Sequence, residues 1–139
     1  MLVEHFPPDG EKLLTVRGRG PEDVWAVGGT ADPRMLHWDG SGWTPVEVSQ
    51  VCATGGLNGV WTGPGEDVWV AGFFGGVGRW DGENWDCPDF PIAFEHFHAV
   101  WPHQGEMWWA GGNLLAPGGD RALLAVEGRE LTVRLSDCN

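Results

Sequence analysis

The chain is a succession of short apolar runs separated by stretches rich in Gly, Pro and Asp. In the first 50 residues this pattern predicts four β-strands, at about 13–17, 23–27, 35–38 and 43–48. No window shows the spacing of apolar positions that is typical of an amphipathic helix. The segment VWAV at 24–27 is apolar on both faces, as expected of a strand that is covered on each side by another sheet. The pattern therefore predicts an all-β fold.

The four-strand pattern occurs three times along the chain. The segment DVWAVGG at 23–29 recurs as DVWVAG at 67–72 and, more loosely, as EMWWAGG at 106–112. Further on, LHWDGSGW at 36–43 recurs as GRWDGENW at 78–85. A period of roughly 40 residues with four strands in each unit is typical of the blades of a β-propeller. The sequence thus predicts three four-stranded antiparallel blades, and a closed six-bladed ring if two chains associate.

These units organise the whole chain, 1–139, as a single propeller segment. We expect an N-terminal extension at 1–12, blade 1 at 13–54, blade 2 at 55–94 and blade 3 at 95–139. Blade 3 keeps the Gly pair after its second strand but has neither of the two later Trp residues. A protein with one binding site in every blade is expected to keep that site in all of them. The loss of these Trp residues in blade 3 therefore weakly disfavours such a multivalent protein.

Residues that recur in the repeat are expected to be structural. Asp followed by Gly joins the third strand to the fourth, because Gly accepts a positive φ without penalty. The acidic pairs at 22–23 and 66–67 also lie in repeated turns. A Trp that every blade requires is better explained by packing between blades than by contact with a ligand. The Gly that ends the second strand is expected to let a neighbouring blade or the central channel approach closely. The repeated set is Trp25, Trp69, Trp108, Trp38, Trp80, Trp43, Trp85, Gly28, Gly72, Gly111, Asp39, Gly40, Asp81 and Gly82.

The repeat resembles Kelch-type propeller repeats, in which an apolar strand ending in a Gly pair is followed by an aromatic residue and then by a Trp. The matching positions are Val27, Gly28, Gly29, Trp38 and Trp43 in blade 1, and Gly72, Trp80 and Trp85 in blade 2. It is also similar to bacterial propeller repeats built around DVWAVG. The resemblance implies the fold but not one function, because such propellers serve as adaptors, lectins and occasionally oxidases. The copper ligands of the oxidase branch include a Tyr, and this chain has none.

Four residues outside the repeated set are candidates for ligand contact. Trp109 has no Trp counterpart in the other two blades. His96 and His98 are two residues apart in a predicted strand, which would point both side chains the same way, and His103 follows that strand. No carboxylate or Cys stands at convincing metal-ligand spacing from the His pair. We therefore assign no metal and no cofactor.

Composition narrows the choice of partners and compartment. The net charge of −12 argues against nucleic acid and against anionic membrane surfaces. No secretory signal and no apolar stretch of membrane-spanning length is visible, so we expect a cytoplasmic protein or a piece of a larger one. The three cysteines, Cys52, Cys87 and Cys138, have no CxxC spacing and occupy non-equivalent places in the repeat. We expect them to be reduced and unpaired.

Three functions remain open from the sequence. The leading hypothesis is a non-enzymatic binding or scaffold module that associates with itself, most simply as a homodimer, and takes a protein or carbohydrate ligand. The first alternative is a small oligomeric lectin that binds carbohydrate through Trp-lined pockets between blades. The second is a hydrolase or lyase that uses acidic loop residues. No Ser-His-Asp order, P-loop or dinucleotide fingerprint is present.

Overall fold

The computed structural model describes residues 10, 12–51, 53, 55–63, 65, 67–87, 96–112, 121–127 and 130–134, the last two segments by their backbone alone. This part of the chain contains twelve strands and no helix. The strands form three antiparallel sheets of four strands, each with its strands in chain order. The predicted all-β class and the three four-stranded units are confirmed.

The strands follow the repeat closely. The first sheet contains β1 (Leu13–Gly20), β2 (Asp23–Gly28), β3 (Arg34–Trp38) and β4 (Trp43–Pro45). The second contains β5 (Leu57–Thr62), β6 (Val68–Gly72), β7 (Val77–Trp80) and β8 (Trp85–Asp86). The third contains β9 (Phe97–His103), β10 (Glu106–Gly112), β11 (Arg121–Glu127) and β12 (Glu130–Arg134).

The fourth strand of the first sheet is shorter than predicted, ending at Pro45 rather than near Val48. Val46 still donates a backbone hydrogen bond to Met35 O at 2.9 Å. The Glu47 carboxylate then accepts a hydrogen bond from Ser49 N at 2.7 Å, which turns the chain away from β3. A side chain that bonds its own backbone therefore ends the strand.

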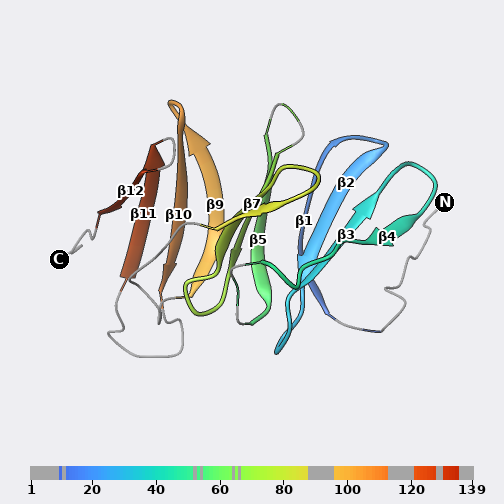
Figure 1. The fold of residues 1–139 in the computed structure, drawn as a ribbon, viewed down its shortest axis with the longest axis horizontal. Helices are drawn as coiled ribbons and strands as arrows, with labels where there is room; N and C mark the ends of the chain where they lie inside the picture. The colour runs from blue at the N-terminus through green and yellow to red at the C-terminus, as the bar shows by residue number, and fades with distance from the viewer. Residues whose placement is uncertain are drawn as a thin grey trace.

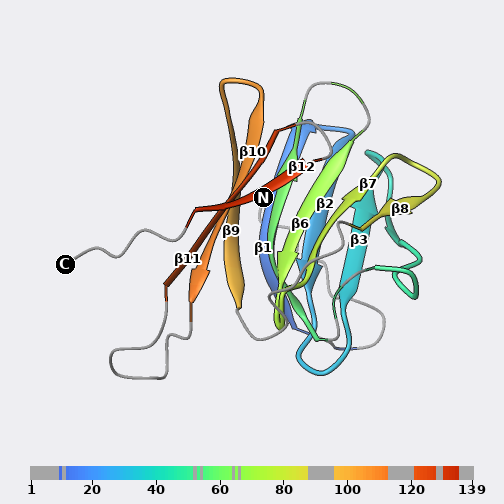
Figure 2. The ribbon, with the colours of Figure 1, turned by 60° about the vertical axis from the view of Figure 1, so that its left-hand side comes forward.

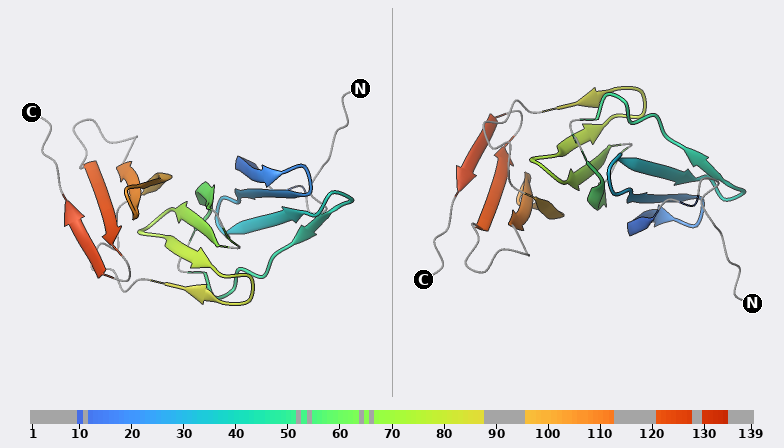
Figure 3. Two further views of the ribbon diagram at one scale, coloured as in Figure 1. Left: turned by 90° about the horizontal axis from the view of Figure 1, so that it is seen from above. Right: turned by 90° about the horizontal axis from the view of Figure 1, so that it is seen from below.

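The three sheets stand side by side, with most of their strands roughly aligned along one axis (Figures 1 and 2). Seen from above, the first strands β1, β5 and β9 gather on one side of an arc, and the fourth strands lie on the other side (Figure 3). Side chains join the first strands: Thr15 Oγ1 donates to Asn58 O, and Asn58 Nδ2 donates to Phe97 O at 3.1 Å. The sheets are thus connected along their inner edge.

The core consists of two apolar layers, one on each side of the second sheet. The layer toward the first sheet contains Trp25, Val27, Met35, Ala53, Leu57, Val60, Val68 and Val70. The layer toward the third sheet contains Ala71, Val77, Phe97, Val100, Met107 and Trp109. The neighbours Val70 and Ala71 belong to different layers because successive side chains of a strand point to opposite faces. A strand that is apolar on both faces is therefore covered on both sides, as predicted for this repeat.

The Asp-Gly turns between third and fourth strands are confirmed as structural. Asp39 Oδ1 accepts hydrogen bonds from the backbone N–H groups of Ser41 and Gly42 at 2.8 and 2.9 Å. Asp81 makes the corresponding two bonds in the second sheet. The residue after Asp39 is Gly40 with φ = 94°, a conformation that residues with a Cβ rarely adopt. The carboxylate and the Gly together specify the turn.

Asp39→Ala is expected to destabilise the fold at neutral pH, and the difference from the wild type should vanish in acid. Hydrogen bonds from the Ser41 hydroxyl and from the Ser41 and Gly42 N–H groups lower the pKa of Asp39 from 3.8 to about 2. Because the folded pKa lies below the unfolded one, the stabilisation is complete above about pH 4 and is lost as the pH falls toward 2. Thermal melts followed by circular dichroism at both ends of this range measure it. An equal deficit at both would contradict the assignment.

The expectation that all three cysteines are unpaired is wrong for Cys87, which is disulfide-bonded. The other two, Cys52 and Cys138, lie outside the described residues. Cys87 Sγ lies 3.4 Å from Gln50 O, and nearby Trp85 Nε1 donates to Glu47 O at 2.9 Å. Glu47 and Gln50 therefore lie beside Trp85 and Cys87, where the outer edges of the first and second sheets meet. These positions are not equivalent in the repeat, so the repeat does not predict that they meet.

Candidate functional site

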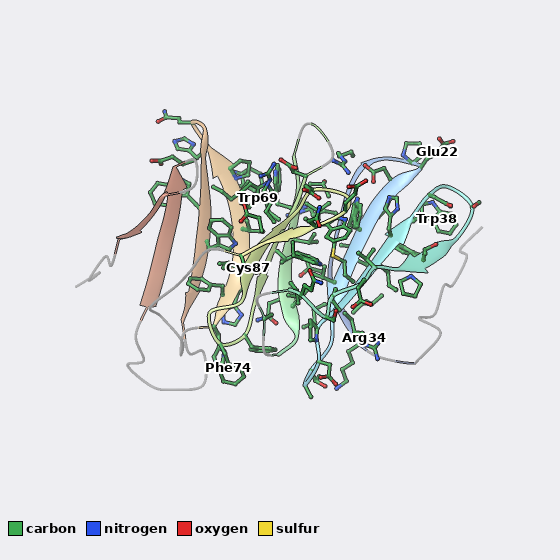
Figure 4. All side chains as sticks on the ribbon, viewed as in Figure 1. Glu22, Arg34, Trp38, Trp69, Phe74 and Cys87 are labelled. Atoms are coloured by element: carbon green, nitrogen blue, oxygen red, sulfur yellow. The ribbon has the colours of Figure 1, made fainter. Side chains whose placement is uncertain are left out.

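A cleft of about 590 Å³ opens between the first and second sheets, at the end that carries the β1–β2 and β7–β8 turns. Its walls are formed by Arg19, Asp23, Trp25 and His37 of the first sheet and by Trp80, Gly65 and Gly82 of the second. Glu22 and Trp38 lie near this end of the molecule, whereas Arg34 and Phe74 lie at the opposite end (Figure 4). The cleft therefore combines two indole rings with a carboxylate, a guanidinium and an imidazole.

Asp23, the first residue of β2, organises the polar wall of the cleft. Its Oδ1 lies 2.8 Å from both Trp25 Nε1 and His37 Nε2, and its Oδ2 accepts from Arg19 Nε. Partial burial alone would raise the pKa of Asp23, but the hydrogen bonds from the three donors and the Arg19 charge outweigh burial and hold it below its ordinary value. Asp23 is therefore an ionised acceptor, and both of its oxygens already accept hydrogen bonds within the protein.

Two of the three partners of Asp23, His37 and Arg19, make further contacts. Because an ionised carboxylate only accepts hydrogen bonds, His37 carries its proton on Nε2. The His37 ring stacks on Trp25, with ring centroids 4.2 Å apart and planes 27° apart. Arg19 Nη1 donates to Gly65 O on the second sheet and so bridges the cleft. The polar wall is thus held by contacts within the protein.

The second sheet repeats this arrangement with Arg79 in place of His37. Arg79 Nη2 donates to Asp67 Oδ2 at 2.8 Å, and its guanidinium lies over the Trp69 ring at 5.6 Å from the centroid. The strand register pairs Trp69 with Arg79 just as it pairs Trp25 with His37. A carboxylate, an indole and a hydrogen-bond donor opposite the indole are therefore a repeated structural unit, and His37 is what distinguishes the copy in the cleft.

The sequence interpretation placed Asp23 in a turn and did not single out Arg19 or His37. Asp23 does lie directly after the β1–β2 turn, but its carboxylate accepts hydrogen bonds from other side chains and not from the backbone of its own turn. A signal was available in the spacing: residues 23 and 25 point to the same face of a strand, and the repeat places a nitrogen-bearing side chain, His37 or Arg79, opposite the Trp. Only the register of β2 and β3 shows that this side chain lies beside the Asp.

The three candidate histidines have different surroundings. His96 Nδ1 accepts from Phe74 N at 3.3 Å. His98 Nε2 donates to Gly112 O at 3.0 Å, and Asn58 Nδ2 lies 3.4 Å from its Nδ1. His103 is exposed at the end of β9. The structure does not bring these rings to one site among the described residues.

Trp109, the candidate singled out by asymmetry, lies between the second and third sheets. Its side chain is fully buried, its Nε1 donates to Val70 O at 3.0 Å, and it meets the Trp69 ring edge-on at 5.7 Å between centroids. An indole closed off in this way packs two sheets together. We therefore take the cleft, and not Trp109, as the candidate site.

Searches for a metal site, a membrane span and related proteins identify no other candidate site in the described part of the chain. Among the described residues, no three His, Cys, Asp or Glu side chains gather in a way that could hold a metal ion. The described part of the chain contains no helix with the length and apolarity needed to cross a membrane. The chain matches no protein-family model and no curated protein.

Proposed function

We propose that this chain is a three-blade segment of a β-propeller and a non-enzymatic binding module, with the cleft between its first two sheets as the ligand site. The chain-order sheets and the contacts between successive first strands support the propeller. The same organisation is implied by the resemblance to Kelch-type and DVWAVG repeats.

The observation that carries the binding role is the prearranged wall of the cleft. Arg19, Asp23, Trp25 and His37 are held by hydrogen bonds to one another, by stacking and by the bond to Gly65 O. A ligand that meets fixed groups loses less affinity to the ordering of side chains than one that must organise them. The volume of about 590 Å³ lies within the usual range for small-molecule sites.

The acidic residues favour binding over catalysis. A hydrolase or lyase of the kind considered from the sequence needs a carboxyl group that exchanges a proton near neutral pH. The hydrogen bonds to Asp23, Asp39 and Asp81 instead lower the pKa of each of these groups. They act as acceptors within the fold, which makes the enzymatic alternative the less supported one.

A carbohydrate is the ligand class that the cleft favours. Indole rings bind the apolar faces of sugars, and Trp25 and Trp80 both border the cleft. Asp23 already accepts from three donors, which leaves little capacity for a donor on the ligand, so the wall favours a ligand that supplies acceptors, and the Arg19 guanidinium is the charged donor that borders the cleft. Hydroxyl-rich and acidic saccharides meet this requirement.

Arg19→Ala is expected to weaken saccharide binding by about ten- to a hundredfold, the range for a hydrogen bond to a charged group. Fluorescently labelled wild-type protein on a glycan array identifies the saccharide, and titration of the Trp fluorescence with that saccharide gives the dissociation constants. Arg34→Ala is the matched control, because it removes the same charge at the opposite end of the molecule (Figure 4). Circular dichroism verifies that both variants are folded.

Each outcome bears on a separate part of the proposal. A blank array would overturn the carbohydrate assignment. Binding that is unchanged in Arg19→Ala would move the site out of the cleft. Release of a cleaved or eliminated product from the bound saccharide, detected by mass spectrometry, would overturn the non-enzymatic role.

A further inference from the structure

Equivalent positions of the three first strands differ sharply in exposure. Val16, Val60 and Val100 occupy the same register position, opposite Ala26, Val70 and Trp109 of the second strands. Val60 and Val100 are 2% and 7% exposed, whereas Val16 is 57% exposed. Val60 and Val100 each have a preceding sheet beside them, and Val16 has none among the described residues. The exposed face of β1, formed by Leu13 and Val16, is called the leading face below.

The same comparison holds for Leu13. Its counterparts Leu57 and Phe97 are both fully buried, whereas Leu13 is 37% exposed. Leu14 is also exposed, at 52%, but its counterpart Asn58 bonds to the third sheet, which follows its own, so Leu14 is not part of the leading face. Large apolar side chains that the fold buries wherever a sheet precedes them are therefore open to solvent on the leading face.

The third sheet presents the complementary difference on its other side. Val27 and Ala71, which pack toward the following sheet, are fully buried, but the corresponding Ala110 is exposed. Trp101 is 56% exposed, and Ala99 is exposed beside it on β9. The face formed by Ala99, Trp101 and Ala110 is called the trailing face. It is a sheet face from which the following sheet is missing.

A row of stacked side chains runs along the inner edge from one sheet to the next. The Arg17 guanidinium lies over the Trp61 ring at 6.0 Å from the centroid, and Trp61 meets Trp101 with centroids 4.6 Å apart. These three residues share one register position, opposite Trp25, Trp69 and Trp108. A further sheet would place its own residue of this register position against Trp101. In the first sheet of the chain that residue is Arg17.

We infer that the trailing face receives the leading face of a second copy of this chain, so that two copies close a six-bladed ring; this inference rests on the propeller proposed above. Arg17 of the second copy then stacks on Trp101, a cation–π contact. Each face measures roughly 300 Å², from strands about 4.8 Å apart and about five residues long. Two such contacts bury about 1,200 Å² in total, the lower end of the range for specific interfaces. A head-to-tail contact used twice closes the ring and leaves no open face.

Sedimentation velocity of the whole chain across a wide concentration range tests this inference. The wild type is expected to sediment as a species of about twice 15.1 kDa. Val16→Asp on the leading face and Ala110→Asp on the trailing face should each raise the dimer dissociation constant by about tenfold or more, because each buries an unpaired charge. Phe74→Asp is the matched control: Phe74 is similarly exposed, at 51%, but belongs to neither face, so its variant should dimerise normally.

The outcomes are decisive in either direction. A wild-type monomer at all concentrations would overturn the inference, and so would loss of the dimer in Val16→Asp with no effect of Ala110→Asp, because that result indicates contact between two leading faces. If Val16→Asp does not fold, Leu13→Asp takes its place. A monomer that still binds saccharide through the cleft overturns this inference alone, whereas a dimer that binds no saccharide overturns only the proposed ligand.

Discussion

Trp109→Ala is expected to lower the free energy of unfolding by about 3–5 kcal/mol, the range for deleting a large aromatic side chain from a core. The Trp109 indole is fully buried between the second and third sheets. Its removal leaves a cavity beside Trp69 and leaves Val70 O without the donor that now lies at 3.0 Å. Urea unfolding followed by far-ultraviolet circular dichroism measures the change.

Trp109→Phe separates the two parts of this effect. Phe keeps an aromatic ring between the sheets but has no N–H group, so the hydrogen bond to Val70 O is lost while much of the packing remains. Its cost is expected to be about 1–3 kcal/mol, below that of the Ala variant. A loss of less than about 1 kcal/mol in Trp109→Ala would contradict the assignment of this residue to the core.

Gly111→Ala is expected to destabilise the fold by about 3 kcal/mol, at the upper end of the range for overpacking. A Cβ at Gly111 would stand 1.9 Å from His96 O and 2.7 Å from Phe97 Cα. Both atoms belong to the backbone, so no side-chain rotation relieves the clash. The ends of β9 and β10 would have to separate. Chemical unfolding of the purified variant measures the loss.

Gly42→Ala provides the matched control. A Cβ at Gly42 meets nothing within 4 Å, and this residue does not have the positive φ that favours Gly. The stability of this variant is expected to stay within about 0.5 kcal/mol of the wild type. Equal losses in Gly111→Ala and Gly42→Ala would indicate a general cost of replacing Gly and not a close approach of the backbone.

The Gly residues that end the second strands owe their place to their own sheet. A Cβ at Gly28 would stand 2.0 Å from Lys12 O, just as one at Gly111 would meet His96 O. In both sheets the carbonyl belongs to the residue just before the first strand. The sequence interpretation expected neighbouring blades or a central channel to approach these positions. The approach is real, but it comes from within the sheet, where the register of the first and second strands brings the two backbones together.

The sequence by itself determined the strands and their turns. The second strands are short apolar runs, and each Asp-Gly turn is specified by bonds that reach only two or three residues along the chain, as at Asp39. The recurrence of these local signals was sufficient to predict three units of four strands. Local interactions are encoded within a few neighbouring residues, so they can be read without knowing where other segments lie.

The tertiary structure alone decided which side chains meet across strands and sheets. Asp23 looked like a turn residue until the register of β2 and β3 placed His37 beside its carboxylate. Trp109 looked like a ligand contact until the packing of the second and third sheets enclosed it. Cys87 looked unpaired because its position does not repeat. In each case the deciding contact joins residues far apart in the chain, and its geometry depends on how whole sheets pack.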